Sequence, residues 1–351
     1  MRAAARGAGG IVRLLAACGL VSPLSGCYVM QAASGQLDVM ASSRPIPSVL
    51  ADPGTPPATR TRIELASEAR DFAIHELALP DSGSYERYAD LGRPYALWNV
   101  VATPEFSLQP LRWCFPVAGC VTYRGYFSES GAQAMAWKLA ARGDDTAVEG
   151  VATYSTLGHF QDPLLSTMLG WRDTRLVGTI FHELAHERLY VAGDSEFNEA
   201  FASVVEEAGV RLWLAARGGE REIAAYDASK HREVEFVALL REARTRLVKL
   251  YSSGLPAAEM RIEKNREFGL LKFDYQVLKG GWGGYAGYDA WFARPINNAR
   301  LASVATYHDC VPGLERELVA AGSLPAFYAR ADELAKLTRA ERRAAVCGAS
   351  P

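Results

Sequence analysis

The stretch GTIFHELAHERLYVAGDSEFNEAFASVVEE, residues 178–207, carries most of what this chain reveals about its fold and chemistry. It holds two histidines four residues apart, His182 and His186, with Glu183 directly after the first. Residues i and i+4 of an α-helix lie on one face, so both imidazoles can reach one metal ion. Glu183 is offset by about 100° around the helix, where it can contact a water molecule at an open coordination position. The pattern H-E-x-x-H therefore predicts a zinc site with Glu183 as its general base.

The residues that flank the motif favour a metal site over a chance pattern on the solvated face of a core helix. They are mostly apolar or small: Thr179, Ile180, Phe181, Leu184 and Ala185. Such flanks predict a helix that is buried on more than one side. Two buried histidines and a glutamate need polar partners, and a metal ion supplies one.

A catalytic zinc site has three protein ligands and one open position, so the motif needs one more ligand. The spacing H-E-x-x-H-x-x-G-x-x-H, with a third histidine, is absent. Five acidic residues follow at short range: Asp194, Glu196, Glu199, Glu206 and Glu207. Asp194 suits a helix cap, whereas Glu196, Glu199 and Glu206 share one face of the next helix. These positions alone leave the third ligand open.

The periodicity of apolar residues predicts the surrounding fold. A helix capped by Asp173 is expected to run through the motif to about residue 191, and Gly193 can turn the chain into a second helix that ends near residue 214. Upstream, residues 95–127 are rich in Val, Tyr, Trp and Phe and punctuated by Pro and Gly, which predicts strands and hairpins. A helix around 132–141 and a strand-like stretch over 147–158 are expected to follow. A helix is also expected over 62–79.

This order of elements favours an α+β fold that is mainly helical with a smaller antiparallel β-sheet, and the H-E-x-x-H motif predicts that it is a zinc-metallopeptidase domain. We expect a single domain over residues 61–351, with a β-rich part at about 95–158 and a helical part at about 173–351. A helix over 228–252 is expected to serve as scaffold.

The composition excludes some partners. The 351 residues are 49% hydrophobic with a net charge of −2, so no basic excess is available to neutralise phosphates, and no nucleic-acid partner is expected. The glycine-rich stretch KGGWGGYAGYDAWF, residues 279–292, lacks the G-x-G-x-x-G spacing, so no nucleotide site is predicted.

The N-terminus has the pattern of an export signal. Arg2, Arg6 and Arg13 precede an apolar stretch over 14–24, which is too short for a membrane-spanning helix. The ending Leu-Ser-Gly-Cys, residues 24–27, resembles a bacterial lipobox, whose cysteine is lipidated and becomes the first residue of the mature protein. The alternative is a plain secretory signal with a chance cysteine.

The lipobox reading implies a lipoprotein signal peptide over 1–26 and a lipid anchor at Cys27 that holds the chain on a membrane. The residue directly after the cysteine is Tyr28 and not an aspartate, a pattern that resembles lipoproteins sorted to the outer membrane of Gram-negative bacteria. We therefore expect an exported protein, lipid-anchored in the bacterial cell envelope at the outer membrane and facing the periplasm. Residues 27–60 are expected to form a tether and an N-terminal extension packed on the body.

Four further cysteines, an even number in an exported chain, predict two disulfides. Cys114 and Cys120 flank FPVAG, whose proline and glycine suit a tight turn, so we expect them to pair. Cys310 and Cys347 then pair by elimination. No C-x-x-C pair is present, which argues against a structural zinc site made of these cysteines.

Five separated segments carry a resemblance that covers essentially the whole mature chain: YVMQAASGQLDVM (28–40), WCFPVAGCVTYRGYF (113–127), TYSTLGHFQDPLLSTML (153–169), FHELAHERLYVAGDSEFNEAFASVVEEAG (181–209) and INNARLASVATYHDCVP (296–312). Together with the lipobox, they resemble a bacterial family of predicted zinc aminopeptidases that are exported lipoproteins. The resemblance implies a metallopeptidase fold, one Zn²⁺ ion, and His182, His186 and Glu199 as its ligands.

The step Asn-Glu-Ala at 198–200 resembles the third-ligand segment of thermolysin-like peptidases and large zinc aminopeptidases, together called gluzincins. This resemblance favours Glu199 as the third ligand. Only twelve residues separate His186 from Glu199, fewer than in those enzymes, so the connection must be a tight helix-turn-helix. Glu206 is expected to hold a ligand histidine by its ring N–H, and it is the alternative third ligand.

These features predict a zinc-dependent peptidase, of aminopeptidase type, that acts on a peptide substrate. The candidates to stabilise the oxyanion are Tyr285, Tyr288, Tyr307 and His308. Tyr307 or His308 is favoured, because both lie in a segment of the resemblance. The strand-like TYSTLG, residues 153–158, could pair with an extended substrate or be a core strand. Two alternatives stay open: a zinc endopeptidase of the cell envelope, and a non-catalytic zinc-binding envelope lipoprotein.

Overall fold

The computed structural model describes residues 23–115, 119–154, 161–304 and 310–347. The helices are α1 (Pro23–Ser42), α2 (Ile46–Ala51), α3 (Pro57–His75), α4 (Glu129–Ala140), the 3-10 helix η1 (Ser166–Met168), α5 (Asp173–Arg188), α6 (Ser195–Ala216), α7 (Glu220–Tyr251), α8 (Ala257–Gly281), α9 (Asp289–Ala293), α10 (Asn298–Val304), α11 (Val311–Ala321), α12 (Leu324–Ala335) and α13 (Arg339–Val346). The strands are β1 (Ser43–Pro45), β2 (Arg87–Ala89), β3 (Leu97–Thr103), β4 (Trp113–Phe115), β5 (Gly119–Val121), β6 (Arg124–Tyr126), β7 (Asp145–Val151) and β8 (Leu164–Leu165). The expected mainly helical α+β class with a small antiparallel sheet is confirmed.

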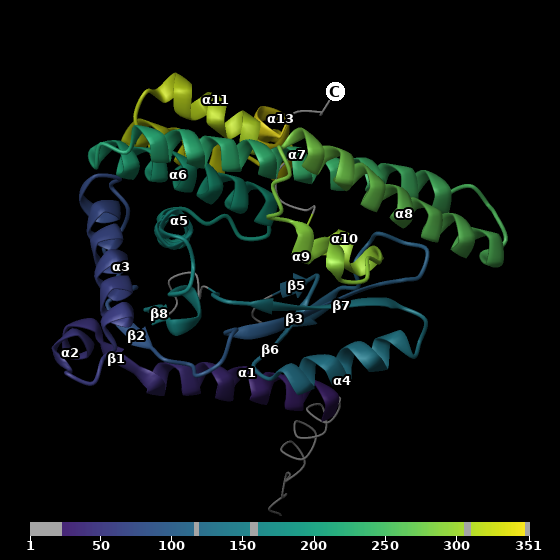
Figure 1. Cartoon of the computed structure of the whole chain (residues 1–351), viewed down its shortest axis with the longest axis horizontal. Helices are drawn as coiled ribbons and strands as arrows, with labels where there is room; N and C mark the ends of the chain where they lie inside the picture. The colour runs from purple at the N-terminus through teal and green to yellow at the C-terminus, as the bar shows by residue number, and fades with distance from the viewer. Residues whose placement is uncertain (1–22, 116–118, 155–160, 305–309, 348–351) are drawn as a thin grey trace, which may run out of the picture.

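The main sheet has the order β6-β3-β7, and all its pairs are antiparallel. Alternate residues of β3 point to opposite faces. Trp98 and Val100 pack with α4, which lies beneath the sheet in Figure 1, whereas Val101 packs with Ala299 of α10 on the other face. A second small sheet, β1-β2-β8, contains one parallel pair, β2 with β8.

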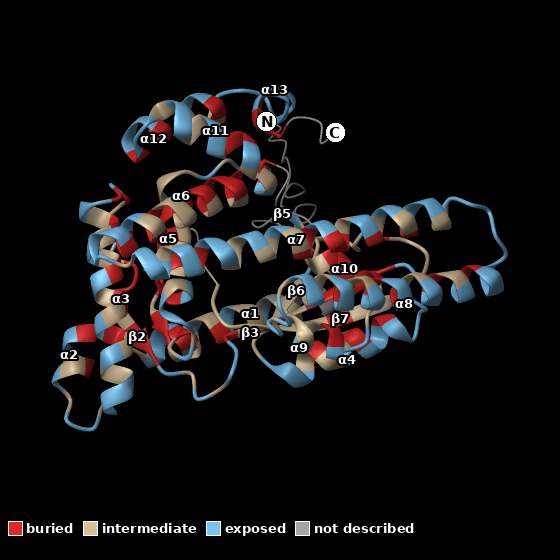
Figure 2. Cartoon of the chain, turned by 45° about the horizontal axis from the view of Figure 1, so that its top comes forward, coloured by how far each residue is buried: buried red, intermediate tan, exposed pale blue. Residues whose placement is uncertain are grey.

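Helices α5 and α6 form the centre of the helical part. Apolar residues at helical spacing on α5, such as Ile180, Phe181 and Leu184, are buried together with Phe197 and Phe201 of α6 in one core. Runs of buried residues also mark α6 and α10 in Figure 2. Because α5 and α6 bury their apolar stripes against each other, the polar residues of the motif are held at the junction of these two helices.

The turn between α5 and α6 is as predicted from the sequence, whereas the two ends of α5 differ from the prediction. Gly193 adopts φ +80°, the left-handed region that glycine favours, and the Asp194 side chain caps α6 by accepting a hydrogen bond from the Phe197 N–H. However, α5 ends at Arg188, because the chain is already extended at Leu189. At the start of α5 the cap position falls on Arg172, so Asp173 is the first helical residue and not the cap, and its carboxylate pairs with Arg62.

A further helix, α8, was not expected from the sequence. It runs beside α7 and shares a separate core with it (Figure 1), in which Leu240, Leu247, Leu271 and Tyr275 are buried. Apolar residues also lie on the exposed face of α8, including Phe273. Apolar side chains on two faces blur the helical period, which explains why the pattern failed here.

The segment expected to hold a tether and an extension contains α1. Gln31 Nε2 donates to the Gly125 carbonyl at 3.1 Å, and the Tyr154 hydroxyl donates to Gln36 Oε1 at 2.6 Å. Val39 is buried in the main core, so this part of α1 packs on the body. Among the helices that the structure describes, none combines the length and apolarity that a membrane crossing requires.

Both expected disulfides are present. Cys114–Cys120 joins the paired strands β4 and β5, and Cys310–Cys347 joins the start of α11 to the end of α13.

Candidate metal centre

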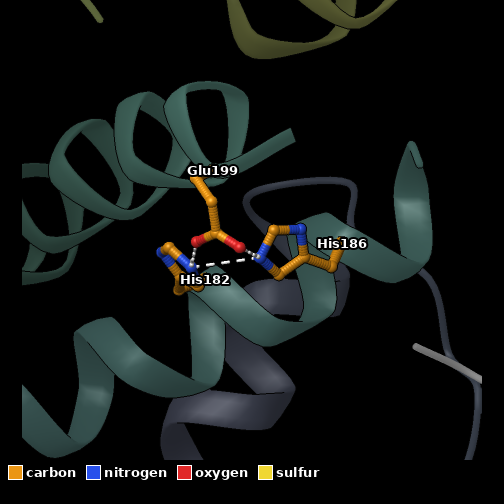
Figure 3. A group of neighbouring side chains, drawn as sticks. All are labelled: His182, His186 and Glu199. Carbon is orange, nitrogen blue, oxygen red and sulfur yellow. Dashed lines mark hydrogen bonds and ion pairs between the residues drawn. The ribbon is translucent and has the colours of Figure 1, made fainter. Parts of the chain in front are cut away.

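The α5–α6 pair brings three of the expected ligands together. His182 and His186 lie one turn apart on α5, with their Nε2 atoms 3.1 Å from each other. Glu199 on α6 points between them (Figure 3): its Oε2 lies 3.3 Å from His182 Nε2 and its Oε1 lies 3.6 Å from His186 Nε2. The ligand atoms of the three residues all lie within 4.8 Å of one another. The short connection around Gly193 is therefore long enough to return Glu199 to the histidines.

Glu206 holds the other side of His182. Its Oε2 lies 3.1 Å from His182 Nδ1, so Nδ1–H donates to this carboxylate and a neutral imidazole keeps its lone pair on Nε2, toward His186 and Glu199. Gly178 makes room for this contact, because a Cβ at position 178 would lie 3.0 Å from Glu206 Oε1.

The carboxylates set the charge of the centre. Burial lowers the pKa of His182, but hydrogen bonds with Glu199 and Glu206 outweigh burial and raise that pKa to about 10. Burial raises the pKa of Glu199, yet hydrogen bonds with His182 and His186 lower it to about 2. The centre thus concentrates negative charge around two imidazoles, an environment that favours a bound cation.

Glu183 lies on the next face of α5, toward a different set of neighbours. Burial raises its pKa, and the charges of the two histidines offset this only in part. On this side the Ser84 hydroxyl donates to Glu187 Oε1 at 2.8 Å, and the buried Tyr85 follows with φ 63°. A tyrosine in the left-handed backbone region is strained, and no local pattern in the sequence predicts this conformation. Tyr85 is a residue near the centre that sequence reasoning missed.

The donor set fits zinc. Two imidazole nitrogens and one carboxylate oxygen converge, which is the ligand set of catalytic His₂Glu zinc sites. The buried His186 Nδ1 has no hydrogen-bond partner among the described residues, while its Nε2 faces the other donors. The other group with ligand-like spacing, Glu196 with Cys310 and Cys347, is different, because its two sulfur atoms are joined in a disulfide.

Comparison with known proteins identifies the family. A family model described as "Putative aminopeptidase" matches residues 27–346, which include the whole α5–α6 pair. The chain belongs to this aminopeptidase family. No curated protein matches the chain, and neither does any solved structure. Family membership supports a peptidase activity for the centre described above.

Several other residues that the sequence offered as site residues are not among the described residues of the cluster formed by His182, His186 and Glu199. Tyr307 and His308, and residues 155–158 of the strand-like TYSTLG, lie outside the described residues. Asp194 is buried beneath α13, where Arg342 Nη2 lies 2.8 Å from its Oδ2. Glu196 pairs with Arg343 of the same helix. These two carboxylates therefore tie the C-terminal helix to α6.

A cleft of about 1270 Å³ reaches the centre of this aminopeptidase-family chain. Its walls come mainly from α5, α6, α7 and α11, and His182, Glu199 and Glu206 are among the residues that line it. From these residues it follows α5 toward the start of that helix, past Thr179 to Arg175. A peptide could thus approach His182 and Glu199 along α5.

Proposed function

We propose that the chain is a zinc-dependent aminopeptidase of the gluzincin type, in which His182, His186 and Glu199 hold one Zn²⁺ ion. The observation that carries this proposal is the position of Glu199, whose two oxygens each face one histidine Nε2. Membership of the aminopeptidase family supports the same reaction class.

A zinc ion in this centre would polarise the scissile carbonyl and lower the pKa of the attacking water. Glu183 accepts the proton of that water and delivers it to the leaving amine. Its raised pKa, caused mainly by burial, brings it closer to neutral pH and so makes it a more effective proton shuttle. Glu206 orients His182 through Nδ1. Tyr307 and His308 remain the proposed donors to the oxyanion.

We also propose that the chain is exported and anchored through lipidated Cys27 at the outer membrane, facing the periplasm. The lipobox ending at Cys27 carries this proposal, and the two disulfides support it, because disulfides persist in oxidising compartments such as the periplasm. Replacing Cys27 by serine should abolish incorporation of labelled palmitate. Continued labelling of that variant would contradict lipidation at this position.

The activity is tested with purified chain that starts at Tyr28, loaded with zinc and given peptides with a free or an acetylated N-terminus. An aminopeptidase binds about one zinc per chain and cleaves only the free-amine peptide. Cleavage of both peptides identifies an endopeptidase instead. Bound zinc with cleavage of neither peptide identifies a zinc-binding lipoprotein without this activity, and a stable chain that binds no zinc overturns the metal centre.

A further inference from the structure

The cleft beside the metal centre is lined by arginines at the start of α5, Arg172 at its N-cap and Arg175 in its first turn, that neither the motif nor the proposed mechanism uses. Arg175 stacks on the Trp171 ring, with Cζ 4.3 Å from the ring centroid. A guanidinium on an aromatic face is held in place while its N–H groups stay available to a planar acceptor.

No carboxylate in the described residues forms an ion pair with either arginine. The nearest acid in sequence, Asp173, pairs with Arg62 instead. Burial lowers the pKa of Arg175, and the charges of Glu206 and Glu233 offset this only in part. Within the described part of the chain neither guanidinium is held in a close ion pair, so the N–H groups of both arginines remain available to a carboxylate of the substrate.

The remaining charges of the cleft do not compete for the same role. Lys230 on α7 lies 3.2 Å from Glu207 and 2.8 Å from Glu233, so its charge is already matched. Glu206 is engaged by His182. Glu222 and Glu315 belong to the walls formed by α7 and α11, and Arg241 lines the cleft from α7, on a different wall from α5.

Helix geometry sets the distance between the arginine and the metal centre. Arg175 and His182 are seven residues apart on α5, which places them on the same face and about 10 Å apart along the axis. An extended peptide advances about 3.3–3.6 Å per residue. A substrate whose scissile carbonyl lies at the centre would therefore bring a group two or three residues further on to Arg175.

We propose that Arg175, assisted by Arg172, binds a carboxylate of the substrate two or three residues beyond the cleaved bond. This inference rests on the proposed peptidase function and names its substrate class: short peptides, chiefly tripeptides, with a free C-terminal carboxylate. An acidic side chain at the same distance offers the same chemistry. The guanidinium would bind either carboxylate by donating two parallel N–H hydrogen bonds, a bidentate contact.

The test compares a tripeptide as free acid, the same tripeptide as C-terminal amide, and an amide with aspartate at its last position. We expect kcat/KM for the free acid to exceed that for the plain amide by about 10- to 100-fold, the range of a hydrogen bond to a charged group. Arg175→Gln should bring this ratio close to one. Arg142→Gln, an exposed arginine just beyond α4, should leave it unchanged. Recovery with the aspartyl amide identifies a side chain as the carboxylate source.

Binding measurements separate this inference from the proposed activity. Calorimetry on zinc-loaded Glu183→Gln should show tighter binding of the free acid than of the amide, and Arg175→Gln in that background should abolish the difference. Equal binding of both peptides overturns the carboxylate site even if the enzyme is active. If wild type cleaves no peptide but the binding difference is present and depends on Arg175, the proposed function fails and the carboxylate site stands.

Discussion

His182 contacts a carboxylate through each of its two ring nitrogens: Nε2 faces Glu199 and Nδ1 faces Glu206. The two carboxylates have different tasks, although they share one face of α6. Glu199 reaches the atoms that would coordinate the metal, whereas Glu206 reaches only the outer nitrogen. The two carboxylates therefore have different roles because each contacts a different ring nitrogen of His182.

Substituting these two residues separates their tasks. Glu199→Ala should weaken zinc binding by more than 100-fold, because a direct ligand is lost. Glu206→Ala should weaken it by about 10- to 100-fold, as expected for a residue that only orients a ligand. Zinc affinity is measured by competition with a chelator, and Glu207→Ala, which removes a neighbouring acid paired with Lys230, is the control. A larger loss for Glu206→Ala would assign the ligand role to Glu206.

Glu183→Gln tests the general base. The variant should keep its zinc, because Glu183 is offset from the ligand face, while kcat falls by about 10²- to 10⁴-fold, since the amide cannot accept the proton. Metal content and kcat are measured on the same preparation. Glu187→Gln, one turn further along α5, should keep most of the activity. A fully active Glu183→Gln variant would rule out this base.

At the scale of elements, α5 and α6 approach closely because two glycines lie at their junction. Gly178 on α5 faces Glu206 and Val210, and Gly209 on α6 faces Phe181 and Leu77. Phe181 directly precedes the first histidine, so packing at Gly209 and the position of the metal ligands are coupled. The geometry of the centre therefore depends on the spacing of the two helices.

Gly209→Ala should destabilise the fold. A Cβ there would lie 2.7 Å from Leu77 Cδ1 and 2.8 Å from Phe181 Cδ2, so we expect a loss of about 1–3 kcal/mol in the free energy of unfolding. Gly269→Ala in α8 is the matched control: no atom lies within 4 Å of the new methyl group, and a gain of up to about 1 kcal/mol is expected. Urea unfolding of both variants measures the two changes; equal effects would contradict the close helix contact.

At the scale of the whole molecule, ion pairs and a disulfide connect the last described helix, α13, to the start of α6 and of α11. Arg342 and Arg343 of α13 pair with Asp194 and Glu196 at the start of α6. The Cys310–Cys347 disulfide closes a long loop beside these contacts, with a sequence separation of 37, whereas Cys114–Cys120 closes a short one with a separation of 6. The two disulfides should therefore differ in their effect on stability.

Removing each disulfide by a double alanine substitution tests this difference. Loop-closure entropy predicts a loss of about 4 kcal/mol for the Cys310–Cys347 pair and about 2 kcal/mol for the Cys114–Cys120 pair, because the longer loop gains more freedom in the unfolded chain. Thermal and urea unfolding measure both. A larger loss for the short loop would show that a local contact, and not loop closure, dominates.

The sequence by itself determined the elements with strong local signals. The H-E-x-x-H spacing places His182, Glu183 and His186 on one helix, and Gly193 requires a turn there. The disulfide pairs followed from counting and from one turn motif. By contrast, α8 carries apolar residues on two faces, so its period was not recognisable, and the strained backbone of Tyr85 leaves no trace in the local pattern.

Only the tertiary structure decided which acids meet the histidines. Glu196, Glu199 and Glu206 share one face of α6, so helical periodicity treats them alike. The docking of α6 on α5 brings Glu199 to both Nε2 atoms, while α13 engages Glu196 through Arg343. The cleft that joins His182 to Arg175 also exists only because α7 and α11 pack beside α5 and α6. Local propensity acts within one element, whereas these contacts depend on how several elements pack together.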